Sequence, residues 1–465
     1  MIVVLLSIPN LNLVLISMKH FLNGFLRRYV VLTTVSTTLC RPLGTAWKNR
    51  LKKQRLPIGK LLLIPFFILQ FLTSCQPSLD VQISNPSERV RTNEMVEVDL
   101  DTIQEGLNLS DRNSFIVQNE HGKTVPYQIT HDNKVIFQTT VAPRGKTTFK
   151  IRPGKPEAFD VKVCGRLYPE RLDDLAWEND LVGFRAYGPA LQKSGERGFG
   201  YDLFAKRGTN KPVLEGMYAR ATNDSLLAHL RELQKTDPKA ARKFRREITY
   251  HVDRGYGMDC YAVGPTLGAG VAALLEDGQI VYPWCYQTCE ILDNGPLRFT
   301  VRLVFPPLTY KGKDIVETRE ISLDAGSHMN RTTVSYQNIQ EEAPVVVGIV
   351  LHDENKAITA STAKRIIAYQ DPTTGRNQGQ LFVGHVYTEP VKDTRIVYFS
   401  KEEMKMRNYA RGYVLAENVY APGSELIYYW GFGWNRSDVK NFTEWNEYLE
   451  FFAERLKEPL RVTLD

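Results

Sequence analysis

The feature that most constrains the fold is a succession of short strands separated by turns. Alternating apolar and polar residues predict strands at 81–83, 96–98, 114–117, 125–129, 135–137 and 148–151, with hairpin turns at His121-Gly122 and Asp132-Asn133. We therefore expect a small β-sandwich over residues 81–153, ending at the turn-forming segment Pro153-Gly154-Lys155-Pro156.

A second and longer series of strands occupies residues 160–465. Strands are predicted at 182–187, 301–305, 318–323, 331–337, 345–351, 380–386, 394–398, 410–415 and 424–430. Their regular recurrence with Gly and Pro turns favours a large antiparallel sandwich. Two helical patterns interrupt it, an insertion near 224–246 that breaks at Asp237-Pro238 and a C-terminal helix near 443–456. The expected fold class is mainly β.

The chain before residue 81 has the pattern of an export signal. A basic stretch at 51–55 precedes an apolar run at 61–72, which ends in Leu72-Thr73-Ser74-Cys75. The run is shorter than the ~20 residues of a spanning helix. The ending resembles the lipobox of bacterial lipoproteins, in which the cysteine thiol is acylated. We expect residues 1–74 to be a non-structural leader, Cys75 the lipidation site and 75–80 a tether.

Alternatives to this interpretation remain. A buried apolar helix can end in Cys by chance, and residues 1–50 can be a true membrane helix. The expected reason for the long leader is a start placed too early, with Leu51 the better and Met18 the weaker candidate for the real initiator. No acidic residue follows Cys75, because the next residue is Gln76. We therefore expect an outer-membrane lipoprotein, facing either the periplasm or the cell surface.

The positive formal charge of +7 comes from the leader. Residues 1–74 carry ten Lys and Arg and no Asp or Glu, so the remainder has 49 basic and 52 acidic residues. The remaining chain gives no argument for nucleic-acid binding. Its four cysteines after Cys75 are predicted to be core or disulfide residues, namely Cys164, Cys260, Cys285 and Cys289.

Several long motifs resemble a family of exported bacterial proteins. They are Asp173-Asp174-x-Ala176-Trp177-Glu178-Asn179-Asp180, Arg185-x-Tyr187-Gly188-Pro189, the segment from Tyr250-His251 to Gly264, and the closing Trp445-x-x-Tyr448-Leu449 with Pro459-Leu460. The family is catalogued as a domain of unknown function, and its genes recur in polysaccharide-utilisation loci beside lyases and unsaturated-uronate hydrolases. The resemblance implies a galactose-mutarotase-like β-supersandwich over about residues 80–465. It also implies a role on acidic glycans, as a lyase or sugar dehydratase.

The chemistry of β-elimination indicates which residues to examine. Removing the C5 proton of a uronate requires a cation on its carboxylate, a base, and an acid for the leaving oxygen. Arg185 is the predicted carboxylate ligand. The candidate bases and acids are Tyr250, His251, Tyr261 and His352. The carboxylates predicted to orient these groups, or to bind Ca²⁺, are Glu178, Asp180, Asp253 and Asp259.

Other interpretations of the same residues stay open. Trp284, Trp430 and Trp434 can stack on sugar rings or pack in the core, and Trp430, Phe432 and Trp434 are expected on one strand face. Glu354, Glu389 and the group Asp173, Asp174 and Glu178 keep a glycoside hydrolase open. A sugar epimerase or mutarotase, or a non-catalytic glycan-binding protein, also fits the fold. The expected partner is an acidic saccharide, and no cofactor is required.

Overall fold

The computed structural model describes residues 77–209 and 211–465. All of them belong to one compact unit, Ser74–Asp465. The predicted leader and the predicted lipidation site, Cys75, lie outside the described residues. Among the helices that are described, none has both the length and the apolar character needed to cross a membrane.

The first part of the described chain forms the predicted small β-sandwich. Its two sheets have the strand orders β26-β1-β6-β3 and β2-β5-β4. Their bounds are β1 Leu79–Ser84, β2 Arg91–Asp99, β3 Phe115–Gln118, β4 Tyr127–Ile129, β5 Lys134–Val141, β6 Lys146–Pro153 and β26 Arg461–Leu464. A helix that the sequence did not predict, α2 (Leu100–Leu107), follows β2 directly and buries Leu100, Ile103 and Leu107. The side chain of Asp99 caps it by accepting from the Thr102 amide at 3.0 Å.

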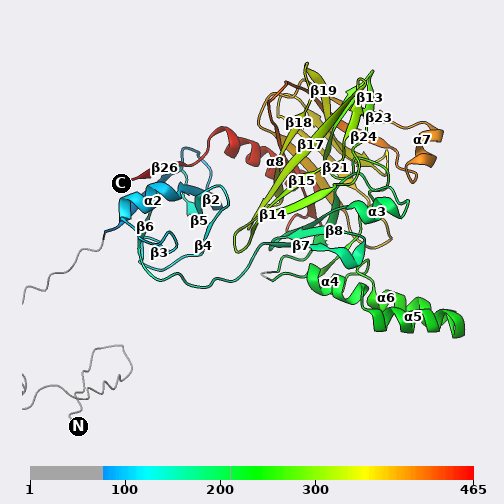
Figure 1. Ribbon diagram of the computed structural model, residues 1–465, viewed down its shortest axis with the longest axis horizontal. Coiled ribbons are helices and arrows are strands. Elements are labelled where there is room, and N and C mark those ends of the chain that lie inside the picture. Colours follow the sequence, from blue (N-terminus) through cyan, green and yellow to red (C-terminus); the bar gives the residue numbers. More distant parts are fainter. Residues whose placement is uncertain (1–76, 210) are drawn as a thin grey trace, which may run out of the picture. The chain divides into compact units, whose positions relative to one another are not determined.

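The last strand of the chain completes this small sandwich. β26 pairs antiparallel with β1, from Val81 opposite Leu464 to Ser84 opposite Arg461. The half-buried side chains of Val462 and Leu464 pack against the core of the sandwich. The sandwich is therefore built from both ends of the described chain (Figure 1).

Removing residues 461–465 is expected to lower the stability of the small sandwich by about 2 kcal/mol, because two half-buried aliphatic side chains and an edge strand are lost. Denaturant unfolding measures the loss of stability. Faster limited proteolysis within residues 77–153 shows that the small sandwich is the part destabilised. A matched Lys457→Ala variant, at the exposed end of the C-terminal helix, should leave both unchanged. Equal stability of the truncated and full chains would contradict this role of β26.

The large domain consists of three antiparallel sheets. One has five strands in the order β11-β10-β9-β8-β7. Their bounds are β7 Cys164–Tyr168, β8 Asp174–Glu178, β9 Val182–Ala186, β10 Asp202–Lys206 and β11 Gly257–Asp259. A second has the order β13-β12-β19-β24-β23. Its strands are β12 Val271–Glu276, β13 Gln279–Val281, β19 Ala343–Leu351, β23 Asp393–Tyr398 and β24 Gly412–Tyr420.

The third sheet has nine strands, in the order β14-β15-β17-β18-β25-β22-β21-β20 with β16 paired to β17. They are β14 Thr288–Asn294, β15 Arg298–Val304, β16 Leu308–Tyr310, β17 Lys313–Asp324, β18 Met329–Gln337, β20 Ile358–Ser361, β21 Ile366–Asp371, β22 Leu381–Tyr387 and β25 Leu426–Trp434. One continuous apolar core joins the three sheets. The predicted mainly β fold with a large antiparallel sandwich is confirmed.

The helices lie between strands or at the end of the chain. They are α3 Pro189–Lys193, α4 Leu214–Ala221, α5 Asp224–Thr236, α6 Pro238–Ile248, α7 Lys401–Met406 and α8 Phe442–Lys457. The predicted break at Asp237-Pro238 separates α5 from α6, which form a projecting hairpin (Figure 1). Asn441 caps the predicted C-terminal helix α8, whose buried face contains Trp445, Leu449 and Phe452.

Candidate active site

A buried row of charges lies on one face of the five-stranded sheet that contains β7–β11. Alternation along the strands turns Trp177, Phe184 and Leu203 toward the main core. The residues between them therefore face the opposite side, which α4 and the aromatic rings of Tyr218 and Tyr250 cover. The charged residues on this side are Asp174, Glu178, Arg185, Asp202, Lys206 and Asp259, all 5% exposed or less.

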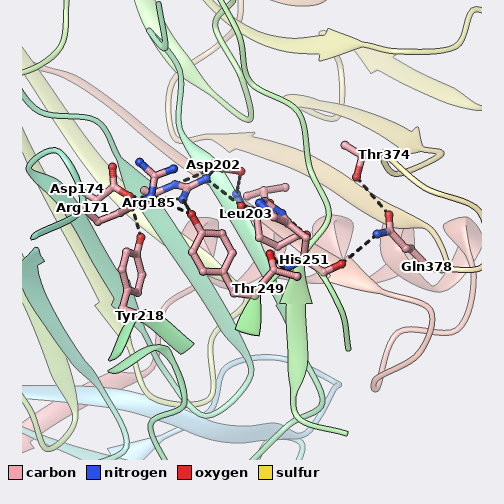
Figure 2. Close-up of polar contacts among 12 residues, drawn as sticks. Arg171, Asp174, Arg185, Asp202, Leu203, Tyr218, Thr249, His251, Thr374 and Gln378 are labelled. Atoms are coloured by element: carbon pink, nitrogen blue, oxygen red, sulfur yellow. Dashed lines mark hydrogen bonds and ion pairs between the residues drawn. The ribbon is translucent and has the colours of Figure 1, made fainter. Parts of the chain in front are cut away.

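Arg185 is the centre of this row (Figure 2). Its Nε donates to Asp202 at 3.0 Å, its Nη1 contacts Asp174 at 3.4 Å, and its Nη2 donates to Asp259 at 2.9 Å. Nη2 also contacts Asp202 and the Tyr187 hydroxyl. The guanidinium is thus surrounded by three carboxylates. Its predicted role as a ligand for a substrate carboxylate is wrong for this arrangement, because its donors are already engaged and buried.

One guanidinium cannot neutralise three buried carboxylates, so protonated forms are favoured within the cluster. Burial raises the pKa of Asp174, although Arg185 opposes the shift. Burial and the neighbouring Asp202 raise the pKa of Asp259 to about 6. Asp259 is therefore a carboxyl group whose proton exchanges close to neutral pH.

His251 is the exposed acid–base group beside this cluster. Its Nδ1 lies 3.2 Å from the Asp259 carbonyl oxygen and 3.5 Å from Asp259 Oδ2, while its side chain is 57% exposed. The backbone contact orients the ring with its Nε2 edge away from Asp259.

Replacing Asp259 with asparagine tests the raised pKa. The folded protein holds a proton on Asp259 up to a pH of about 6, whereas the unfolded chain releases it near 3.8. The stability that this proton contributes is fully present below pH 3.8. It is lost as the pH rises from 3.8 to about 6, by on the order of 3 kcal/mol. Denaturant unfolding at several pH values should show this fall in the wild type and not in Asp259→Asn. Equal pH slopes in both proteins would contradict the assignment.

Tyr250 lies between two guanidinium groups. Its hydroxyl oxygen accepts from Arg185 Nη1 and from Arg171 Nε, each at 3.2 Å. Arg171 is half-buried and makes no ion pair with a carboxylate among the described residues. The adjoining Leu172 and Asp173 both have left-handed backbones, with φ of 57° and 58°. Such conformations cost energy for side chains other than glycine, and they often occur at functional sites.

Tyr261 and His352 form a second group next to the first. Tyr261 follows Asp259 by two residues, and its ring centroid is 5.5 Å from that of His352. The Tyr261 hydroxyl is buried and has no hydrogen-bond partner among the described residues. His352 Nδ1 lies 2.5 Å from Asp371 Oδ2. Burial lowers the pKa of His352, but Asp371 outweighs that effect and raises it overall.

The loop between β21 and β22 connects the two groups. It begins at Asp371, which binds His352. The amide of Thr374 donates to the Cys260 carbonyl at 3.0 Å. Gln378 reaches the His251 carbonyl at 3.5 Å (Figure 2). The predicted residues His251, Arg185, Tyr261 and His352 therefore belong to one continuous polar region, which we call the histidine–arginine site.

The predicted aromatic platform does not exist on β25. Trp430 and Trp434 lie on one strand face with Phe432, as expected, but all three are in the core. The Trp430 ring stacks on Tyr201 at 4.2 Å between centroids. Trp430 and Trp434 are therefore unavailable for stacking on a sugar. Trp284 is 41% exposed, so its predicted sugar contact stays a prediction.

The other predicted carboxylates have separate structural partners. Glu178 pairs with buried Lys206 at 2.5 Å and accepts from two amides at the start of α4. Asp253 holds Arg207, and Asp180 accepts from the Gly326 amide at 2.7 Å. No group of three or more His, Cys, Asp or Glu in the described chain could hold a metal ion. These residues therefore do not fit a calcium site.

The cysteines and the hydrolase candidates also occupy defined places. All four described cysteines are free, so the disulfide alternative is wrong, and Cys260 and Cys285 are buried. Of the carboxylates considered for hydrolysis, Asp174 belongs to the histidine–arginine site. Asp173 instead accepts from the Ala190 amide at 3.0 Å.

Three members of the site were not singled out by the sequence, namely Asp202, Asp371 and Arg171. Asp202 and Asp371 each end or begin a strand and contact residues 17 and 19 positions away. Asp202 stands directly opposite Arg185 in the register of β9 and β10. Correct pairing of these two strands would have found it.

This chain belongs to the family described as a domain of unknown function, DUF4861, whose model matches residues 83–462. A protein called "Uncharacterized protein P7", from Formosa agariphila, is 26% identical over 341 residues, which cover 71% of this chain and 78% of that protein.

Two solved structures from Enterococcus faecalis are similar in fold at 8% identity, each over 84% of this chain. One is an alpha-mannosidase (TM-score 0.42) and the other a protein of glycosyl hydrolase family 38 (TM-score 0.45). The matched regions span 46% and 48% of those chains, about half their length.

Proposed function

We propose that this protein is a carbohydrate-active enzyme that cleaves uronate-containing oligosaccharides by β-elimination. One observation carries the proposal. His251 presents an exposed imidazole beside the buried Asp259, whereas Arg185 holds the carboxylates of the same site. An exposed imidazole can take a proton from a bound substrate, whereas carboxylates buried in ion pairs with Arg185 cannot reach it. The arrangement therefore favours proton abstraction by His251 over catalysis by the carboxylates. The sequence motifs shared with exported proteins of polysaccharide-utilisation loci support the substrate class.

Each bond change in the proposed reaction has a residue near it. The Nε2 atom of His251 takes the C5 proton of the uronate. The released electron pair forms the C4–C5 double bond while the C4–O bond breaks. The leaving oxygen then receives a proton from His352, whose side chain is 20% exposed and whose pKa is raised by Asp371. The products are an unsaturated uronate and a new hydroxyl group, with no water consumed.

The cation that acidifies the C5 proton must differ from the one predicted from sequence. Arg185 is saturated by its three carboxylates. Arg171 is the better candidate, because its Nε contacts Tyr250 and it has no carboxylate partner among the described residues. Two contacts of Asp173, with Ala190 and Tyr286, hold the adjoining left-handed turn. Arg171 is therefore fixed in place before substrate binds.

Hydrolysis is the second candidate, and one observation favours it. Asp202 and Asp259 both contact the same Nη2 atom of Arg185, and Asp259 has a pKa of about 6, a value suited to a general acid. Both carboxylates are at most 2% exposed, however. A sugar would reach them only if Tyr250 and α4 moved. An epimerase or a non-catalytic glycan-binding protein would use the same surface.

Ultraviolet absorbance tests the proposal, since only elimination makes a conjugated double bond. Incubating the full chain with oligogalacturonate, oligoguluronate and glucuronate-containing oligomers should raise absorbance for at least one of them. Reducing ends that appear without absorbance would indicate hydrolysis and overturn the proposal. Binding without either change would indicate a glycan-binding protein.

We further propose that Cys75 carries acyl chains that anchor the protein in the outer membrane. The basic stretch, the apolar run and the Leu72-Thr73-Ser74-Cys75 ending support it. Wild type should incorporate a labelled fatty acid and fractionate with membranes, and Cys75→Ser should do neither. A matched Cys40→Ser variant should behave as wild type. Equal labelling of Cys75→Ser would contradict the anchor.

A further inference from the structure

A cavity of about 540 Å³ lies between the small sandwich and the outer face of the nine-stranded sheet. The small sandwich contributes β2 and the turn at His131, and α8 closes one end with Phe452 and Arg455. The volume falls within the ~300–1,000 Å³ range of small-molecule sites. We call it the interdomain cavity. The histidine–arginine site lies on a different sheet, and none of its residues lines this cavity.

The floor of the interdomain cavity is one polar row across five strands. Asp293 stands opposite Thr300, Thr300 opposite Ser322, Ser322 opposite Arg331, and Arg331 opposite Tyr429. Residues in such a register share one face of the sheet. All five line the cavity. A sheet face covered by a second domain is normally apolar, so this row requires an explanation.

Two members of the row have unused hydrogen-bonding capacity. Thr300 is 2% exposed, and its Oγ1 has no hydrogen-bond partner among the described residues. A buried hydroxyl without a partner costs about 1–3 kcal/mol. Arg331 donates to Thr333 at 2.9 Å and forms no ion pair with a carboxylate in the part of the chain described. A polar ligand in the cavity could form the hydrogen bonds that both side chains lack.

The remaining groups of the cavity are paired and held in place. Asp293 accepts from the His131 amide and contacts its ring, both at 2.8 Å. Arg298 bridges Glu97 and Asp324 at 2.7 and 2.6 Å. Gln128 accepts from the Arg298 amide at 2.8 Å, which fixes the small sandwich against the sheet. The walls are therefore preorganised.

The lining selects the class of ligand. Six carboxylates and three arginines face the cavity, so a polyanion would be repelled. Paired carboxylates and guanidiniums are planar groups that can accept from and donate to neighbouring hydroxyls. Tyr429 and Phe452 supply apolar ring surface beside them. Vicinal hydroxyls with an apolar C–H face are the features of a sugar.

We infer that the interdomain cavity is a second saccharide-binding site, which takes a short neutral saccharide. Its hydroxyls contact Thr300, Arg331 and Asp293, and a ring face lies against Tyr429. The inference does not depend on the reaction proposed for the histidine–arginine site. It makes the small sandwich part of a binding site as well as a structural appendage.

Titration calorimetry of the full chain with cellobiose, lactose, mannobiose and xylobiose tests this inference, with digalacturonate as the acidic comparison. At least one neutral disaccharide should bind. Arg331→Met and Thr300→Val should each weaken that binding tenfold or more. Thr300→Val keeps the side-chain shape and removes an unpaired hydroxyl, so it should fold as stably as wild type. Ser322→Tyr fills the cavity and should abolish binding.

Four results would overturn the inference. The first is that a neutral disaccharide still binds to Ser322→Tyr, and the second is that Thr300→Val and Arg331→Met leave binding unchanged. The third is that digalacturonate binds more tightly than the neutral disaccharides and that Ser322→Tyr abolishes its binding. The fourth is that none of the five sugars binds. Arg331→Met could fail to fold. Thr300→Val would then decide the outcome alone, because an unchanged unfolding midpoint shows that this variant is folded.

Discussion

Replacing Arg185 with methionine is expected to lower the free energy of unfolding by about 3–5 kcal/mol. The substitution leaves Asp174, Asp202 and Asp259 buried without their common counter-charge. Removing one partner of a buried charge cluster is far more costly than removing a surface pair, because the remaining charges cannot return to water. Denaturant unfolding at neutral pH measures the loss. Acidification should recover part of it, since protonated carboxyls no longer need the guanidinium.

Arg302 provides the matched control. It also lies on a strand and contacts two carboxylates, Glu290 and Glu320, but its side chain is 41% exposed. Arg302→Met should therefore cost about 1 kcal/mol or less. Equal losses for Arg185→Met and Arg302→Met would show that the Arg185 cluster is not the buried network described.

Replacing His251 with glutamine is expected to lower kcat by about 10²–10⁴-fold, the usual contribution of a positioned acid–base group. Glutamine can keep a hydrogen bond near the Asp259 carbonyl, so KM should change much less than kcat. Initial rates of ultraviolet absorbance on the best acidic oligosaccharide measure both parameters.

His121→Gln is the matched control for this prediction, because His121 lies 80% exposed at the tip of a hairpin in the small sandwich. Its rate should equal that of wild type. Full activity of His251→Gln would remove His251 from the reaction and leave His352 as the histidine to test.

The pattern of strands could be read from the sequence because alternation depends on neighbouring residues. The break between α5 and α6 at Asp237-Pro238 and the cap of α8 at Asn441 are local signals of the same kind. Helix α2 was missed because it is only eight residues long and follows a strand without a turn. The pairing of β26 with β1 joins the two ends of the described chain, and no local pattern could reveal it.

Several residues named from the sequence lie near one another, but most of their contacts were not identified from it. His251, Tyr261 and His352 do lie in one polar region with Arg185. The ion-pair partners of Arg185 include Asp202, which is 17 residues away along the chain, so no local pattern could pair the two. Alternation placed Trp430 and Trp434 on one face of β25, but it could not tell a face that meets the core from one that meets a ligand. Burial depends on which sheets pack together.

Mass spectrometry of products formed in oxygen-18-labelled water distinguishes elimination from hydrolysis most directly. Hydrolysis adds one labelled oxygen to the new reducing end. Elimination consumes no water, so its product carries no label from the cleavage step and is lighter than the hydrolysis product by one water. We expect unsaturated products that carry no label when they are analysed before their anomeric oxygen exchanges with the solvent. A labelled, saturated product would contradict elimination and point to Asp202 and Asp259 as the catalytic pair.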